Sequence, residues 1–169
     1  MQDGGNQLRR LFGSLPSVVS VVSAVGSDGV ARGMTCNAVS AVSLSPPLLL
    51  VCLDHRSRTL TAVRERGAFV VNFLAAGRGE ISRRFATGGD DKFAGLTVHA
   101  SGPTGDAPVL VEDSAASAEC RVHDVLDGGD HQIILGRALR CQVYDRPPLT
   151  YFGRRYDAWP VPAVPGAGR

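Results

Sequence analysis

The chain has 169 residues, and its 18 lysines and arginines nearly balance its 16 aspartates and glutamates. This balance gives no electrostatic reason to expect nucleic acid or an anionic membrane as a partner. No apolar run reaches the roughly 18 residues that a membrane-spanning helix needs. The length fits one domain with a real hydrophobic core, so small molecules or other proteins are the expected partners.

The cysteines show no metal-binding or redox pattern, because none forms a C-x-x-C pair and no histidine stands at ligand spacing beside them. Each lies in an apolar or alternating segment, which predicts small buried side chains in a reducing compartment. The first seven residues are polar and lack the apolar core of a secretory signal. A cytoplasmic protein is therefore expected, with free thiols at Cys36, Cys52, Cys120 and Cys141.

The chain opens with a predicted short helix and a β-hairpin. Residues 8–12 place apolar side chains on one side of a helix that would pack on the body and end at Gly13 and Pro16. A valine-rich strand over residues 17–26 then leads through an Asp-Gly turn into a second strand over residues 30–34.

Two different strand patterns follow. Residues 34–44 alternate between apolar and small polar residues, which predicts one strand whose buried face carries Met34, Cys36, Ala38, Val42 and Leu44. The Pro-Pro pair after it ends that strand. The continuous apolar run over residues 48–53 then predicts a strand covered on both faces.

A polar loop, residues 54–59, separates this strand from a predicted helix over residues 60–66. Ser57 or Thr59 is the expected N-cap. A helix N-terminus with hydroxyls and with Arg56 and Arg58 beside it can hold a phosphate. A capped surface helix with solvated arginines explains the same residues.

Residues 68–74 predict a further strand, and residues 80–86 predict a helix. The glycine-rich segment 77–82 imitates a dinucleotide-binding fingerprint, but Ser82 replaces the third glycine and no repeating βαβ pattern follows, so a Rossmann fold is excluded. The end of this helix, with Arg83, Arg84 and Phe85, either faces a ligand or carries two solvated cations and a core aromatic.

The second half predicts a β-meander. A short strand is expected over residues 96–100, a longer one over residues 117–126, and a third over residues 131–144 that is interrupted at Gly136. Many short strands with few helices predict a mainly β fold, a closed or split antiparallel barrel of about six strands with two to four helices.

No motif of a hydrolase or a metalloenzyme is present. G-x-S-x-G, H-E-x-x-H and the P-loop are all absent from the sequence, and its four histidines, at positions 55, 99, 123 and 131, are scattered. Hydride transfer between cofactors requires no such motif, because the cofactors carry the reacting atoms.

The run G-M-T-C-N-A-V-S-A-V-S-L-S-P-P-L at residues 33–48, followed by an apolar strand and a Ser/Thr-rich loop, resembles the flavin reductase domain family. These are small NAD(P)H:flavin oxidoreductases that supply reduced flavin to two-component monooxygenases. Further pieces agree in order, namely A-F-V-V-N-F-L at 68–74, R-F-A at 84–86, K-F-A-G at 92–95, A-P-V-L at 107–110, E-C at 119–120, G-D-H at 129–131 and P-P-L at 147–149.

The resemblance implies a flavin-binding split barrel that forms a homodimer. It implies one flavin reductase-like domain over residues 15–157. An N-terminal segment with the short helix, residues 1–14, precedes the domain, and a Pro/Gly-rich flexible tail, residues 158–169, follows it.

Carried over position by position, the resemblance also implies a flavin site. The isoalloxazine would be lined by Met34, Thr35, Cys36, Asn37 and Ala38. The ribityl chain would pass along Val51, Cys52, Leu53 and Asp54. The phosphate would lie among Ser57, Thr59, Arg84, Phe85 and Ala86. Because Ala38 stands where many relatives have serine, a hydrogen bond there would have to come from the backbone or from Thr35.

The resemblance places His131 at the flavin and the nicotinamide as the catalytic residue, and places Tyr151, Arg154 and Tyr156 near the nicotinamide. A strand-end histidine that bonds a neighbouring backbone group is the alternative for His131. A packed strand end or a dimer contact is the alternative for the C-terminal aromatic segment.

The function implied is that of an NAD(P)H:flavin reductase, which uses NADH, or NADPH, to reduce FAD or FMN for a partner flavin-dependent oxygenase. A non-catalytic flavin- or haem-binding protein on the same barrel is the alternative, and an oxidase of the pyridoxamine-phosphate type is a third. His131 and the segment 151–156 favour the enzyme, because a binding module needs no open nicotinamide face.

Overall fold

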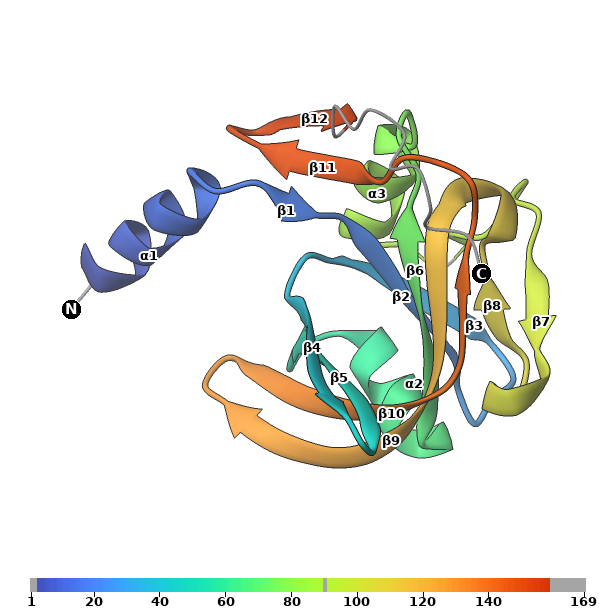
Figure 1. Cartoon of the computed structure of the whole chain (residues 1–169). Helices are drawn as coiled ribbons and strands as arrows, with labels where there is room; N and C mark the ends of the chain where they lie inside the picture. The colour runs from blue at the N-terminus through green and yellow to red at the C-terminus, as the bar shows by residue number, and fades with distance from the viewer. Residues whose placement is uncertain (1–2, 90, 159–169) are drawn as a thin grey trace.

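The computed structural model describes residues 3–89 and 91–158, and this part of the chain is mainly antiparallel β (Figure 1). Its three α-helices are α1 (Asp3–Gly13), α2 (Arg58–Arg66) and α3 (Gly79–Ala86). The first six strands are β1 (Ser17–Val18), β2 (Ser20–Val25), β3 (Ala31–Cys36), β4 (Val39–Leu44), β5 (Pro47–Asp54) and β6 (Ala68–Leu74). The remaining strands are β7 (His99–Ser101), β8 (Ala107–Val109), β9 (Ser114–Gly128), β10 (His131–Val143), β11 (Leu149–Phe152) and β12 (Arg155–Ala158).

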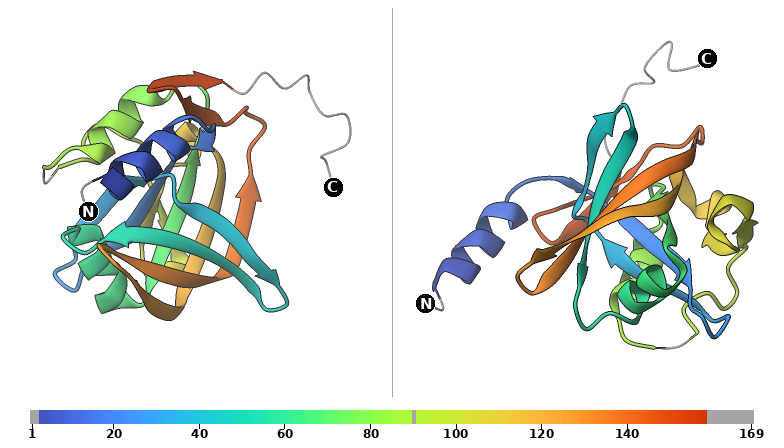
Figure 2. Two further views of the ribbon diagram at one scale, coloured as in Figure 1. Left: turned by 90° about the vertical axis from the view of Figure 1, so that its left-hand side faces the viewer. Right: turned by 90° about the horizontal axis from the view of Figure 1, so that it is seen from below.

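Seven of these strands form one antiparallel sheet in the order β3-β2-β6-β9-β10-β5-β4. The two edge strands, β3 and β4, are joined by only Asn37 and Ala38, so the sheet must curl until its edges meet (Figure 2). The closure brings β3 against β5, the neighbour of β4 in the sheet, where the Cys36 thiol lies 3.4 Å from the Cys52 carbonyl oxygen. The predicted split barrel is therefore present, with one strand more than expected.

The extra strand arises because the expected strand over residues 34–44 is two strands. The chain leaves the sheet at Asn37 and Ala38, and β4 then has a register shift between Ala41 and Ser43. The face that was expected to be buried is exposed along β4, where Val42 is 47% and Leu44 93% exposed, while Val39 packs on the barrel core. The prediction of a single strand with one buried face was wrong beyond Cys36.

The strand β5 also differs from expectation. Val51 and Leu53 are fully buried, whereas Leu48, Leu49, Leu50 and Cys52 are only half-buried. Within one chain, β5 is therefore covered on one face, and the apolar run does not indicate burial on both.

The barrel core includes Val22, Val51, Leu53, Phe69 and Ile134, and α2 packs on it through Leu60, Ala62 and Val63. The predicted N-cap is confirmed, because the Ser57 hydroxyl accepts hydrogen bonds from the N–H groups of Thr59 (3.1 Å) and Leu60 (3.4 Å). Gly67 ends the helix in the left-handed region at φ 65°. Local sequence signals thus predict where α2 begins and where it ends.

A second apolar cluster lies outside the barrel. It joins α3 to β2 and to the small sheet β1-β11-β12 through Val19, Val21, Leu74, Ile81, Phe85, Leu110 and Leu149. Tyr151 and Tyr156 pack at its border. This cluster fixes α3 and the C-terminal hairpin β11–β12 beside the open end of β3.

The helix α1 is longer than predicted and does not pack on the body. It stands away from the barrel in Figure 1 and in the right-hand view of Figure 2. Leu8, Leu11 and Phe12 are 57%, 56% and 64% exposed, so the expected packing within the chain was wrong.

Smaller expectations differ in detail. The short strand expected at residues 96–100 is β7, which begins at His99, and the interruption of β10 at Gly136 is confirmed as a register shift. Cys36 and Cys120 are buried as expected, but Cys52 is half-buried and Cys141 is exposed. Residues 159–169 of the predicted flexible tail lie outside the described residues. No described helix is long and apolar enough to cross a membrane.

Asn72 is a fully buried amide on β6 that fastens three segments together. Its Nδ2 donates to the Ser23 hydroxyl (3.0 Å) and to the Val21 carbonyl (3.2 Å), and its Oδ1 accepts from the Leu110 N–H (2.8 Å). The Ser23 hydroxyl donates to the Pro108 carbonyl at 2.6 Å. The segment after β8 is therefore held to the barrel by buried hydrogen bonds.

The substitution Asn72→Leu keeps the number and branching of the heavy side-chain atoms and removes these hydrogen bonds. It should lower the free energy of unfolding by about 2–4 kcal/mol, because each buried group left without a partner costs about 1–3 kcal/mol. Urea unfolding followed by circular dichroism measures this loss. Asn6→Leu on the exposed helix α1 is the control, with an expected change below about 0.5 kcal/mol. Equal losses in the two variants would contradict a stabilising role for the network.

Candidate functional site

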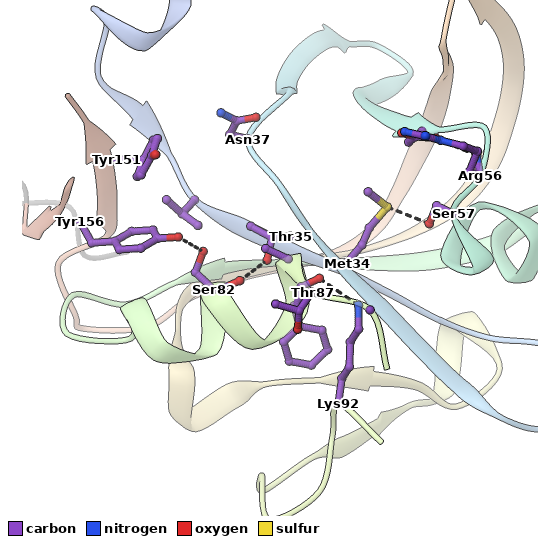
Figure 3. Close-up of a pocket in the computed structure, with 15 residues that line it drawn as sticks. Met34, Thr35, Asn37, Arg56, Ser57, Ser82, Thr87, Lys92, Tyr151 and Tyr156 are labelled. Carbon is purple, nitrogen blue, oxygen red and sulfur yellow. Dashed lines mark hydrogen bonds and ion pairs between the residues drawn. The ribbon is translucent and has the colours of Figure 1, made fainter. Parts of the chain in front are cut away.

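A cavity of about 720 Å³ opens between β3, the exit of β5, α3 and the C-terminal hairpin (Figure 3). Figure 3 shows Tyr151 and Tyr156 at one end of it and Ser57 and Arg56 at the other. Thr35 and Met34 lie between these ends. Its lining comprises Val19, Met34, Thr35, Asn37, Asp54, Arg56, Ser57, Ser82, Phe85, Ala86, Thr87, Gly88, Lys92, Tyr151 and Tyr156. A volume of this size suits a cofactor-sized ligand.

Three contacts on α3 fix Tyr156. The Ser82 hydroxyl donates to the Tyr156 hydroxyl at 3.0 Å, and the Arg83 guanidinium carbon lies 5.1 Å from the centroid of the tyrosine ring. The ring also lies directly on Gly79, where a Cβ would be 3.2 Å from the nearest ring atom. Because the Thr35 hydroxyl donates to the Ser82 carbonyl at 2.6 Å, β3 is tied to the same helix. Thus β3 and α3, which form two walls of the cavity, are held in fixed positions relative to each other.

The opposite end of the cavity is polar and lies at the N-terminus of α2. The Ser57 hydroxyl lies 3.0 Å from the Met34 sulfur, so the cap of α2 touches β3. The Arg56 guanidinium donates to both carboxylate oxygens of Asp54, at 3.1 and 2.8 Å, and holds the pKa of that carboxyl well below its usual range. Helix dipole, hydroxyl and guanidinium together form an environment that favours an anion.

Lys92 closes the side of the cavity. Its ammonium donates to the carbonyls of Gly33 (3.2 Å) and Phe85 (3.0 Å), and so connects the loop after α3 to β3. Phe93 stands edge-on to Phe85 with ring centroids 4.9 Å apart. Burial lowers the pKa of Lys92, and the neighbouring Arg58 lowers it further.

A second cavity of about 490 Å³ adjoins the first and shares its Met34, Arg56, Ser57, Gly88 and Lys92. It extends under the hairpin β2–β3 and is otherwise lined by Val30, Ala31, Arg32, Gly33, Arg58, Thr59, Gly89 and Phe93. The N-terminal end of α2 therefore stands at the boundary between two cavities.

The structure brings most of the predicted flavin-site residues together. Lining the first cavity are Met34, Thr35, Asn37, Asp54, Ser57, Phe85, Ala86, Tyr151 and Tyr156. Thr59 lines the second cavity. Cys36, Val51 and Leu53 instead belong to the barrel core, and neither Ala38 nor Cys52 lines the two cavities.

Arg84 and Arg154 do not line either cavity. The Arg84 guanidinium donates to the Ala94 carbonyl at 2.9 Å, on the outer side of the loop after α3. Arg154 occupies the tight turn between β11 and β12 at φ 65° and is exposed. Helical spacing alone did not reveal that Phe85 faces inward while Arg84 faces outward.

His131 lies beside the first cavity and does not line it. It is the cross-strand partner of Asp54 at the first position of β10. Its Nδ1 lies 2.6 Å from the Asp130 carboxylate, and its side chain is 40% exposed. The histidine therefore stands next to the polar end of the cavity with a carboxylate partner.

Six lining residues were not among the predicted site residues, namely Val19, Arg56, Ser82, Thr87, Gly88 and Lys92. Arg56 had been recognised as a possible phosphate contact beside the helix N-terminus. Ser82 stands three positions before Phe85 in α3, so it shares the face of that inward residue. Lys92 belongs to the K-F-A-G piece that carried the resemblance. The sequence therefore contained evidence from which Arg56, Ser82 and Lys92 could have been predicted as lining residues.

The lining offers no strong nucleophile. Neither cavity contains a cysteine or a histidine, and burial raises the pKa of the nearby Cys36 thiol to about 11. Among the described residues, no group of His, Cys, Asp and Glu is arranged to hold a metal ion. The fold and the site together define a split-barrel protein with a cavity that suits a ring-bearing, anionic ligand.

Comparisons with known proteins agree with this class. Residues 12–160 match the family described as "Flavin reductase like domain". A "Flavin reductase (NADH)" of Kitasatospora aureofaciens is 43% identical over 165 residues, which cover 95% of this chain and 85% of the relative. The reductase component of a 4-nitrophenol 4-monooxygenase/4-nitrocatechol 2-monooxygenase of Rhodococcus opacus is 35% identical, with 89% and 78% of the two chains covered.

A solved structure is similar over nearly its whole length. The NADH:FAD oxidoreductase of Streptomyces globisporus C-1027, in complex with NAD and FAD fragments, gives a TM-score of 0.85 at 32% identity, with 99% of this chain and 98% of that chain covered. The chain belongs to the flavin reductase like domain family. The predictions of this family, of its split-barrel fold and of an NAD(P)H-dependent flavin reductase as the class of enzyme are confirmed.

Proposed function

We propose that this chain uses NADH to reduce FAD or FMN held in the first cavity, and that the reduced flavin passes to a separate oxygenase. The observation that carries the proposal is the shape of that cavity. Its tyrosine-walled end fits a flat ring system, and its other end lies at the N-terminus of α2, which fits a phosphate (Figure 3).

The lining matches the chemical character of a flavin ring. Val19, Met34 and Phe85 offer apolar contact for its faces, while Thr35 and Asn37 offer hydroxyl and amide groups for its polar edge. A flavin bound there supplies the ring that accepts a hydride, and a reduced nicotinamide supplies the hydride. Since Tyr156 is fixed on α3, the cavity can hold two flat rings at a constant separation.

The phosphate is assigned to Ser57 and Arg56. Arg56 uses two of its donors on Asp54, and a guanidinium has about five, so others can reach an anion. Its side chain is 91% exposed and can turn toward the cavity. This assignment replaces Arg84, whose guanidinium is on the outer side of the loop after α3.

Steady-state oxidation of NADH with added FAD or FMN tests the function. The expected result is flavin-dependent loss of NADH absorbance, with the reduced flavin released to solution and reoxidised by oxygen. A chain that binds flavin and never bleaches it with NADH or NADPH would contradict the reductase and support a binding module.

Arg56→Ala should weaken FMN binding roughly tenfold and affect riboflavin much less, because riboflavin lacks the phosphate. Arg84→Ala is the matched control, since it removes an arginine that lines neither cavity. Flavin fluorescence titration gives both affinities. If Arg84→Ala produces the selective loss instead, the phosphate lies at the end of α3.

His131 is proposed as the contact to the nicotinamide. It is the cross-strand partner of Asp54 and lines neither cavity, so it can meet a second ligand at the mouth of the site without holding the phosphate itself. Asp130 accepts a hydrogen bond from its protonated Nδ1 and so orients the imidazole.

His131→Ala should leave flavin affinity nearly unchanged and should slow flavin reduction or raise the Michaelis constant for NADH. Misplacement of reacting rings by about 1 Å can cost on the order of a hundredfold in rate. Stopped-flow bleaching of flavin measures the step. His99→Ala removes a remote exposed histidine paired with Glu112 and is the control. Normal bleaching in His131→Ala would move the nicotinamide contact elsewhere, with Tyr151 and Tyr156 the next to test.

The protein is proposed to act as a homodimer. The helix α1 has an exposed apolar face. In addition, Leu44 and Val143 on the barrel are 93% and 82% exposed. Exposed apolar surface of this extent is typical of protein interfaces. Sedimentation equilibrium that returned the mass of a single 17.8 kDa chain would contradict the dimer.

A further inference from the structure

Ser82 is a fully buried residue of α3 that bonds two hydroxyl groups in the wall of the first cavity (Figure 3). Its backbone carbonyl accepts a hydrogen bond from the Thr35 hydroxyl at 2.6 Å. Its own hydroxyl donates to the Tyr156 oxygen at 3.0 Å. Ser82 therefore decides what each of these two hydroxyls can still offer to a ligand.

The two hydroxyls are left with opposite hydrogen-bonding capacity. A hydroxyl has one proton and two lone pairs. Thr35 uses its proton on the Ser82 carbonyl, so toward the cavity it can only accept. The Tyr156 oxygen accepts from Ser82, and in the part of the chain that the structure describes nothing accepts the Tyr156 proton. The cavity wall thus presents one acceptor and one donor, on either side of Ser82.

Further contacts hold the ring of Tyr156 in place. The Tyr151 ring lies with its centroid 5.1 Å away, and the Arg83 guanidinium carbon lies 5.1 Å from the Tyr156 centroid. At Gly79 a Cβ would be 3.2 Å from the nearest ring atom, so the ring packs directly on the backbone of α3. These contacts keep the hydroxyl at the cavity wall, and they do not depend on the hydroxyl itself.

We infer that Ser82 is a positioning residue, which sets Tyr156 as the donor and Thr35 as the acceptor for one amide group of a bound substrate. An amide offers a C=O and an N–H side by side, which complements a donor beside an acceptor. Two substrates carry such a group, the flavin in its pyrimidine ring and the nicotinamide in its carboxamide. A ring without an amide would leave both hydroxyls without partners, at a cost in affinity. The inference rests on the proposed function, because it assumes that the first cavity receives one of these rings.

Tyr156→Phe keeps the ring and removes the donor, and it should weaken the substrate that carries the amide about three- to tenfold. Thr35→Val removes the acceptor and should weaken the same substrate. Fluorescence titration with riboflavin, which has the ring and no phosphate, reports on the flavin. The Michaelis constant for NADH, with kcat measured beside it, reports on the nicotinamide. Tyr144→Phe is the matched control, because it removes a tyrosine hydroxyl that lies 3.0 Å from the Ser117 hydroxyl, outside both cavities, and should change neither value.

A double-mutant cycle tests whether Ser82 acts through Tyr156. Ser82→Ala leaves the backbone carbonyl that Thr35 bonds and removes only the partner of the tyrosine hydroxyl. It should weaken the same substrate about threefold in the wild type and cause no further loss in Tyr156→Phe. A measurement on the wild type needs no substitution: 3-methylriboflavin lacks the N–H of the flavin amide, so it should bind less tightly than riboflavin if that amide is the one bound.

Weaker riboflavin binding would assign the amide to the flavin, and a raised Michaelis constant for NADH at unchanged riboflavin affinity would assign it to the nicotinamide; either result supports the inference. If Tyr156→Phe behaves like Tyr144→Phe, the inference is overturned while the reductase stands. Additive losses for Ser82→Ala and Tyr156→Phe would overturn it too, as would losses on different substrates for Tyr156→Phe and Thr35→Val. A chain that reduces neither FAD nor FMN with NADH or NADPH would refute the proposed function itself, and the riboflavin titrations would still decide whether the flavin amide is bound.

Discussion

The two-residue link between β3 and β4 is the constraint on which the rest of the structure depends. These strands are the opposite edges of the seven-stranded sheet, and Asn37 and Ala38 alone connect them. The sheet can satisfy so short a connection only by curling into a barrel. The same closure brings the end of β3 beside the exit of β5, so Met34 comes to touch Ser57. The site is therefore a direct consequence of how the barrel closes.

Contacts between distant parts of the chain then give the site its walls. Thr35, Ser82 and Tyr156 form one chain of hydrogen bonds that joins β3, α3 and the C-terminal hairpin. Lys92 makes the equivalent connection on the other side, from its loop to Gly33 and Phe85. Lys92 holds the main chain of β3 through the Gly33 carbonyl, whereas the first connection holds β3 through the Thr35 side chain. A ligand that lies along β3 meets a surface already fixed before it binds.

Local patterns predicted the parts of the fold that depend on neighbours in sequence. The cap at Ser57, the stop at Gly67 and the interruption at Gly136 were all predicted because each follows from the conformational preference of a few adjacent residues. The alternation over residues 34–44 failed because the strand breaks at Asn37 and Ala38 and has a further register shift between Ala41 and Ser43, and the pattern of side chains reveals neither irregularity. Exposure of α1 could not be foreseen, since its apolar face resembles that of a packed helix.

The candidate site was predicted mainly through the resemblance, and one cause explains why some of the predicted residues do not line the cavities. Backbone position and side-chain direction are separate properties. Val51 and Leu53 belong to the strand that leads into the site, yet their side chains point into the core. Arg84 precedes the inward-facing Phe85 by one residue, and a helix turns about 100° per residue, so its guanidinium leaves the cavity. The position of Lys92 could not be predicted from its local sequence, because this residue reaches the cavity through a loop that returns to β3.

The absence of cysteine and histidine from the lining of the two cavities is consistent with the chemistry that the family performs. Hydride transfer between two rings requires their separation and orientation to be fixed, and it requires no nucleophile from the protein. Cys36 stands at the barrel seam next to the site, but burial keeps its thiol protonated, with a pKa of about 11. It therefore packs as a small apolar group and does not compete for the reaction. Selectivity must then come from shape and charge, which here differ between the two cavities. Arg56 and Lys92 line both cavities, but Asp54, which pairs with Arg56, lines only the first, and Arg32, which pairs with Asp28, lines only the second.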